Sequence, residues 1–208
     1  VPVNAGGAGF VSSGAASYAN QVATLTGNAL TITQTSPKAV LNWNSFNVAA
    51  GSSVNFSHPS GSAATLNRIG SADPSVIQGV INSTARDTGG VGGAVYLINR
   101  NGILFDRGVQ VNVGGLVASA LDIGDDVFMN GLLSGAQGKA TTITAPVFTW
   151  GGSAEQFQTS YVKVEAGAEI NTSQEGRVML LAPTVENRVS IATRQGQTIR
   201  AAVAKVFL

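Results

Sequence analysis

Few residues of this 208-residue chain could carry acid–base or metal chemistry. Asp122, Asp125 and Asp126 form its one local group of carboxylates. A glycosidase needs a pair of such groups, whereas a lyase needs calcium ligands and a basic residue. The three aspartates have neither the spacing of an EF-hand loop nor its glycine. We therefore expect solvated loop carboxylates here, and a cation site is the alternative.

The single histidine, His58, lies between Ser57 and Pro59. A catalytic Ser-His-Asp triad is formally possible, but no serine stands in a Gly-x-Ser-x-Gly turn, so we expect an exposed histidine in a turn.

The glycine run 89–93 lacks the Lys-Ser/Thr of a phosphate-binding loop, and we expect it to form a flexible loop. The chain has no cysteine, which excludes thiol catalysis, disulfides and thiolate metal sites. We expect no cofactor and no bound metal.

The charge of the chain also excludes function classes. Charged residues make up 11% of the sequence, where about a quarter is usual, and the formal net charge is +1. Without a cluster of Lys and Arg, a nucleic-acid surface is not expected.

No apolar run approaches the roughly 18 residues of a membrane-spanning helix, so we expect no stable membrane insertion. We expect a monomer.

The elements that must position any site are mostly strands. Val, Ile, Thr and Phe are frequent, and short segments alternate between apolar and polar residues among Gly, Asn and Ser turns. The alternating segments are 29–34, 53–57, 108–113 and 161–165. One helix is predicted over 74–85, because Asp73 could cap it, Pro74 suits its first turn, and its apolar residues form one stripe.

The C-terminal half of the sequence repeats itself. Val164-x5-Ile170 returns 21 residues later as Val185-x5-Ile191, and segment 178–182 returns 20 residues later as 198–202. A period of about 20 residues favours a solenoid over a sandwich. The predicted fold is all-β: a right-handed parallel β-helix with an N-terminal β cap and about eight rungs.

We expect a single domain over residues 1–208, with the cap at about 1–41 and the rungs, with loop insertions, at about 42–208. Because the sequence stops within what we interpret as the opening strand of another rung, we expect an N-terminal fragment of a longer protein.

Trp43 and Phe46 are expected in the core. Four residues fit the repeat poorly, and the sequence does not decide whether they impair the stability or the export of the protein. They are Val189, Arg194, Arg200 and Val203.

Four ordered segments carry a family resemblance. They are 41–48 (LNWNSFNV), 66–70 (LNRIG), 93–103 (GAVYLINRNGI) and 114–122 (GGLVASALD). Together they resemble the N-terminal secretion domain of two-partner-secretion exoproteins, the filamentous-haemagglutinin-type or haemagglutination activity domain. The family has Asn-Pro-Asn-Gly-Ile where this chain reads Asn99-Arg100-Asn101-Gly102-Ile103. Without the proline, we expect this turn to be less stable by up to about 1 kcal/mol.

The resemblance implies a non-catalytic module that directs a large exoprotein of the adhesin or haemolysin type to its outer-membrane transporter. It implies recognition by the periplasmic POTRA domains, passage through the periplasm of a Gram-negative bacterium, and nucleation of β-helix folding outside the cell. The protein would then be secreted or held at the cell surface, where the full-length chain could contact host cells. The resemblance assigns recognition to twelve residues of the motifs. They are Asn42, Trp43, Asn44, Phe46, Asn47, Asn67, Arg68, Asn99, Arg100, Asn101, Gly102 and Ile103.

Two other functions stay open at this point. One is an adhesin domain that itself binds a host glycan or receptor. The other is a β-helix polysaccharide lyase or hydrolase, because parallel β-helices also host such enzymes.

Overall fold

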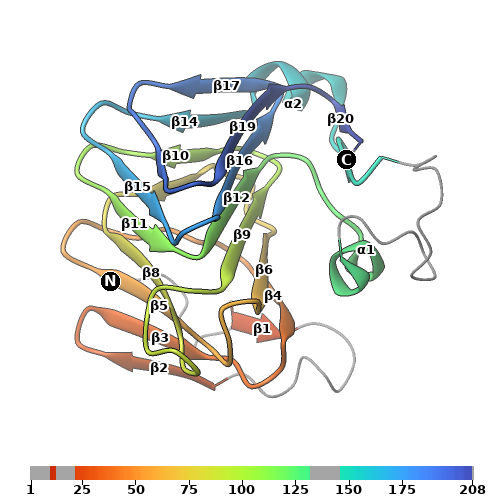
Figure 1. Ribbon diagram of the computed structural model, residues 1–208. Helices are drawn as coiled ribbons and strands as arrows, with labels where there is room; N and C mark the ends of the chain where they lie inside the picture. The colour runs from red at the N-terminus through yellow and green to blue at the C-terminus, as the bar shows by residue number, and fades with distance from the viewer. Residues whose placement is uncertain (1–9, 13–21, 132–145, 208) are drawn as a thin grey trace.

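The computed structural model describes residues 10–12, 22–131 and 146–207 (Figure 1). In this part the chain winds as a coil with three faces, each face a β-sheet, and thus forms a parallel β-helix. Sheet A consists of β1 (Phe10–Ser12), β4 (Lys38–Trp43), β6 (Ala64–Ile69), β9 (Ala94–Asn99), β12 (Gly115–Ser119), β16 (Arg177–Ala182) and β19 (Gln197–Ala202). Sheet B consists of β2 (Val22–Thr26), β3 (Ala29–Thr33), β5 (Ser53–His58), β8 (Val80–Ala85), β11 (Gln110–Val113), β15 (Glu169–Thr172) and β18 (Ala192–Thr193). Sheet C consists of β7 (Ser75–Ile77), β10 (Ile103–Phe105), β14 (Tyr161–Val164) and β17 (Thr184–Asn187).

The N-terminal strands close one end of the coil. Strand β1 runs antiparallel to β4, and β2 runs antiparallel to β3. All other pairings within the three sheets are parallel. Parallel winding begins at β3, so it starts before the boundary expected near residue 41.

The described part contains six parallel strands in each large sheet, fewer than the eight rungs that the sequence suggests. The difference arises between β12 and β14, where the chain leaves the coil. This excursion contains α1 (Asp125–Asn130), β13 (Phe148–Thr149) and α2 (Ala154–Thr159). Strand β13 pairs antiparallel with β20 (Lys205–Val206). In Figure 1, α1 lies beside the outer face of sheet A.

Stacked apolar side chains hold the coils together. In sheet B the register places Leu30, Val54, Ile81, Val111 and Ile170 in one column. Each of them is at most 1% exposed. Such columns explain why short alternating segments suffice, because every coil buries its apolar face against the coil before it.

The central strands of sheet A are covered on both faces. Its outer face packs against a second cluster, to which Phe128 of α1 and Phe148 of β13 contribute. Strand β12 is therefore buried at all five positions. Continuous apolar runs are what a strand covered on both sides requires.

The helix predicted over 74–85 is wrong. This segment forms β7 and β8, which belong to sheets C and B. At the corner between them, a Cβ on Gly79 would lie 2.2 Å from the carbonyl oxygen of Ser52. Two short strands around a tight corner place apolar residues at nearly the same spacing as one helical stripe, so periodicity alone did not separate them.

The predicted repeat is confirmed in part. Segment 178–182 pairs with 198–202, at the predicted offset of 20. The offset of 21 holds in sheet B, where Asn171 pairs with Ala192. In sheet C, Val162 rather than Val164 pairs with Val185, so the offset there is 23. The turns between strands differ in length from coil to coil, and one offset therefore cannot hold for all three sheets.

Candidate functional site: the corner groove

The family segments meet at the corner where each coil passes from sheet A to sheet C. Ile69 at the end of β6 pairs with Asn99 at the end of β9, so the turns that follow these strands lie one above the other. Between them is a groove of about 370 Å³. We call it the corner groove. Its walls include Arg68, Ser71, Arg100, Asn101, Asp122 and Gln156.

Asn99 organises this corner from within. Its side chain is fully buried, and its Nδ2 donates to the carbonyl of Asp73 (3.1 Å) and to Oγ of Ser75 (3.0 Å). Its Oδ1 accepts the backbone N–H of Asn101 at 3.0 Å, which closes the turn. Gly102 completes it at φ 116°, a conformation that favours glycine. The segment is a tight turn, as predicted.

Asn101 links the two stacked turns. Its Nδ2 donates to the carbonyl of Ser71 at 2.7 Å. Its Oδ1 accepts from Nε2 of Gln156 at 3.2 Å. The half-buried Asn101 therefore connects the upper turn both to the coil below and to helix α2.

Trp43 and Asn67 form a second buried pair. The indole Nε1 of Trp43 donates to Oδ1 of Asn67 at 3.0 Å, and Nδ2 of Asn67 donates to the carbonyl of Tyr96 at 3.0 Å. Phe46 packs edge-on against Trp43 at 5.1 Å between ring centroids. Trp43 and Phe46 are 2% and 3% exposed, so the core placement predicted for them is confirmed.

The remaining asparagines of the first motif have different positions. Asn47 accepts the backbone N–H of Val76 through Oδ1 at 2.7 Å, which ties the first corner to β7. Asn42 is half-buried on β4, and Asn44 is exposed in the turn after it. Ile103 is fully buried in β10.

Arg68 holds the start of the excursion against the coil. Its Nε donates to Oδ1 of Asp122 (3.0 Å), its Nη1 to Oδ1 of Asp125 (2.8 Å), and its Nη2 to the carbonyl of Ile123 (2.7 Å). Burial lowers the pKa of Arg68, but the two carboxylates more than offset this, so the net pKa is raised. The three aspartates are solvated, as expected, since Asp126 is exposed and the side chains of Asp122 and Asp125 are 44% and 42% exposed. The ion pairs with Arg68 were not expected from the sequence.

Helix α2 covers the other side of the groove. Ser153 caps it and forms a reciprocal capping box with Gln156. At the far end, Oγ of Ser160 donates to the carbonyl of Arg100 at 2.6 Å. The side chain of Arg100 is exposed, and among the described residues no carboxylate forms an ion pair with it.

His58 is fully buried, so the exposed turn histidine predicted from the sequence is wrong. Alternation along β5 carries Val54, Phe56 and His58 inward together. Nε2 of His58 lies 2.8 Å from Oγ1 of Thr65, whose hydroxyl donates to Oε1 of Gln34. Because that hydroxyl proton is already used, Nε2 donates to Thr65, while Nδ1 lies 3.4 Å from the carbonyl oxygen of Gly92. Burial lowers the pKa of His58 to about 4.

The structure thus brings most of the predicted residues to one corner but gives them different roles. Asn67, Asn99 and Ile103 are interior, whereas Arg68, Arg100 and Asn101 line the groove. Sequence reasoning did not assign Asp122, Asp125 and Gln156 to this site. They lie 54 to 57 residues further along the chain than their partners, and no local pattern signals such contacts.

Within the described residues, no three His, Cys, Asp or Glu side chains are placed to hold a metal ion together. None of the helices in the same residues has the length and apolarity to cross a membrane.

A capped three-sided β-helix with an excursion over one face belongs to the class of parallel β-solenoids. The family model described as TPS secretion domain matches residues 8–206, so this chain belongs to the TPS secretion domain family of two-partner-secretion exoproteins, which Gram-negative bacteria secrete.

Similar proteins come from Haemophilus influenzae. Two curated proteins, each called heme/hemopexin-binding protein, are 34% and 35% identical over 97 and 98 residues. Each match covers 47% of this chain but 10% of the relative, so the chain corresponds to a small part of those proteins. The crystal structure of the HMW1 secretion domain has a TM-score of 0.73 at 22% identity, and the match covers 95% of this chain and 45% of that one. That likeness shows the β-helix fold.

Proposed function

We propose that this chain is a non-catalytic recognition module that directs an exoprotein to its outer-membrane transporter through the transporter's periplasmic POTRA domains. The observation that carries the proposal is the family match over residues 8–206, and the convergence of the family segments on the corner groove supports it. The transporter has to release the exoprotein after recognising it, so its contact with this domain must be transient. An open groove lined by both polar and apolar residues suits such transient binding better than a deep apolar one.

Within the motifs, we divide the twelve residues by exposure. The side chains offered to the transporter are those of Asn42, Asn44 and Arg100. Asn101 acts by holding the stacked turns together, because its amide is already bonded to Ser71 and Gln156. Buried residues such as Trp43, Asn67 and Asn99 act on recognition by fixing the shape of the turns. Arg68 acts in the same way, because its guanidinium is already bound to two carboxylates.

We also infer that the domain nucleates folding outside the cell. The antiparallel strands β1 and β2 close one end, and each later coil finds its apolar partners on the coil before it. A solenoid of this kind can grow by adding one coil at a time. The exoprotein that the domain exports would be of the adhesin or haemolysin type, or would bind haem as the two Haemophilus relatives are named for.

The first test measures recognition and export separately. The chain is produced with a signal peptide together with its cognate transporter, and secreted protein is quantified while binding to the isolated POTRA domains is followed by biolayer interferometry. Arg100→Ala and Asn101→Ala are expected to lower both readouts at least threefold, because the first removes an exposed side chain of the groove and the second breaks the link between its turns.

The matched control is Arg107→Ala, which removes an exposed arginine that does not line the groove and should leave both readouts unchanged. The proposal fails if the unaltered chain neither binds the POTRA domains nor depends on the transporter for export. A reducing-sugar assay on acidic polysaccharides, with and without Ca²⁺, tests the lyase or hydrolase alternative, and activity there would contradict the non-catalytic assignment.

A further inference from the structure

A ladder of asparagine side chains runs across the outer face of sheet B. Nδ2 of Asn82 donates to Oδ1 of Asn55 (2.9 Å), Nδ2 of Asn112 to Asn82 (3.3 Å), and Nδ2 of Asn171 to Asn112 (3.3 Å). All these bonds point the same way along the coil. Aligned amides polarise one another, so the acceptor at the open end is strengthened.

The ladder stops at Asn171. The register places Ala192 in the next position, where a methyl group offers no donor. Among the described residues nothing donates to Oδ1 of Asn171, which therefore faces outward as an unused acceptor. The small side chain of Ala192 also leaves space, and a pocket of about 620 Å³ opens at this point. We call it the ladder pocket.

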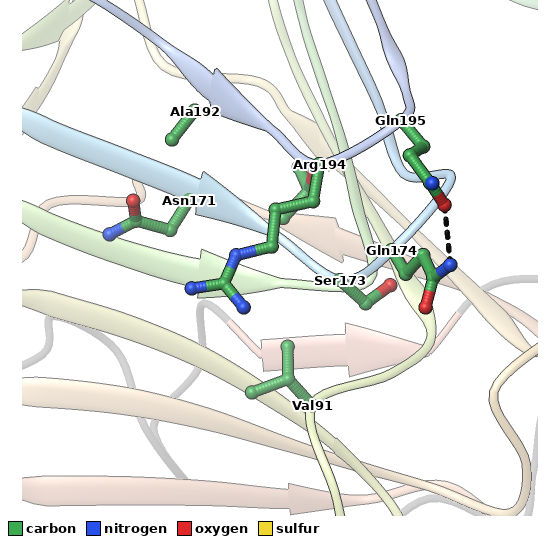
Figure 2. Close-up of a pocket in the computed structure, with 8 residues that line it drawn as sticks. Val91, Asn171, Ser173, Gln174, Ala192, Arg194 and Gln195 are labelled. Carbon is green, nitrogen blue, oxygen red and sulfur yellow. Dashed lines mark hydrogen bonds between the residues drawn. The ribbon is translucent and has the colours of Figure 1, made fainter.

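Figure 2 shows the groups that surround this pocket. Arg194 extends its guanidinium between Asn171 and Val91, and the amides of Gln174 and Gln195 are bonded to each other at the far side. Arg194 is the one charged residue of the lining, and no carboxylate of the described residues pairs with it. Val91 is 47% exposed and gives the pocket an apolar wall.

These features together specify a ligand chemistry. A ligand that fits must bring an anion to Arg194, a hydroxyl donor to Oδ1 of Asn171, and an apolar face to Val91. An acidic sugar has all three, since a uronic acid carries a carboxylate, hydroxyl groups and a face of C–H bonds. From this geometry we propose that the ladder pocket binds a uronic acid residue of a polysaccharide. This site is separate from the corner groove and does not depend on transporter recognition.

The test is an NMR titration of the ¹⁵N-labelled chain with methyl β-D-glucuronide. The expected result is saturable binding with a dissociation constant on the order of millimolar, as for one sugar in an open site, and shifts confined to residues around Asn171 and Arg194. Methyl β-D-glucoside lacks the carboxylate, and cyclohexanecarboxylate lacks the hydroxyls. Each is expected to bind at least fivefold more weakly.

Arg194→Ala and Asn171→Ala are each expected to weaken glucuronide binding at least fivefold. Arg107→Ala, elsewhere on the surface, is the matched control, and thermal unfolding confirms that every variant is folded. Tetrasaccharides of hyaluronan and of polygalacturonate then distinguish an animal from a plant source of the uronate. The proposal is overturned if the glucuronide causes no shifts at 20-fold the expected dissociation constant, if cyclohexanecarboxylate binds equally well, or if Arg194→Ala binds normally.

Discussion

At the scale of single residues, burial decides what a polar side chain does. His58 is the clearest case, because its sequence neighbours Ser57 and Pro59 suggest a turn, yet it fills the interior beside Thr65. The backbone around it is adapted to the ring. A Cβ on Gly93, which lies at φ 82°, would come within 2.0 Å of Nδ1 of His58. This position therefore requires glycine, for reasons of both space and conformation.

The buried histidine predicts how stability depends on pH. The folded-state pKa of about 4 lies below the ordinary value of 6.5, so the folded chain resists protonation. The stabilisation is complete above pH 6.5 and is lost as the pH falls from 6.5 towards 4. The full loss is about 3 kcal/mol in the free energy of unfolding.

Urea unfolding followed by circular dichroism at pH 7.5, 5.5 and 4.5 measures this dependence. Since the chain has one histidine, His58→Gln should flatten the curve between pH 7.5 and 5.5. An equally steep decline in that variant would show that other groups are responsible.

At the scale of elements, a few long-range contacts fasten the excursion to the coil. The N-terminal side of α1 is held by Arg68, and its C-terminal side is capped by Nζ of Lys38, which donates to the carbonyls of Phe128 (2.7 Å) and Met129 (3.1 Å). The ammonium also lies 5.6 Å from the centroid of the Phe128 ring. Both cations come from strands of sheet A, so the helix is positioned by the sheet that it covers.

Arg68→Ala is expected to loosen α1 without unfolding the coil. It leaves Asp122 and Asp125 without their cation and should cost about 1–3 kcal/mol locally. Hydrogen–deuterium exchange of segment 122–131 should then accelerate at least tenfold, while β5 and β8 keep their protection.

Asp126→Ala is the control for this experiment, because Asp126 is exposed and makes no ion pair within the described residues. Asp125→Ala should behave like a milder Arg68→Ala. If Asp125→Ala and Asp126→Ala gave the same exchange rates, the ion pair with Arg68 would not be what holds the helix.

At the scale of the whole molecule, the fold class, the N-terminal cap and the buried Trp43 could be predicted, because alternation and an approximate repeat are local properties of the sequence. The β7–β8 corner could not, since a stripe of apolar residues fits both a helix and two strands. The composition of the corner groove could not either. Its pairing of Arg68 with Asp122 depends on how the coils stack and on where the excursion leaves them.

The stacking also explains Arg200, which the repeat alone makes anomalous. Arg200 pairs with Leu180, a residue of the interior cluster, but it lies on the outermost strand of sheet A and is exposed. When these 208 residues are studied by themselves, a charge that continues an apolar column disfavours pairing of this edge with a second copy. Arg200→Leu is therefore expected to increase self-association.

Size-exclusion chromatography with light scattering at 1–10 mg/mL measures this. Arg107→Leu adds the same apolar side chain at another exposed site and controls for hydrophobicity alone. Equal association of both variants, or a monomeric Arg200→Leu, would contradict the role assigned to Arg200.

The antiparallel strands β1 and β2 give the molecule a direction. They occupy the strand edges at one end, whereas β17, β18 and β19 leave theirs unpaired within the described residues. The parallel winding can therefore continue directly only from the end formed by β17, β18 and β19, much as a ratchet permits motion in one sense. If the chain leaves a pore with its N-terminal strands first, each newly emerged segment would pair with the last coil outside. Sliding back into the pore would then require that coil to unfold.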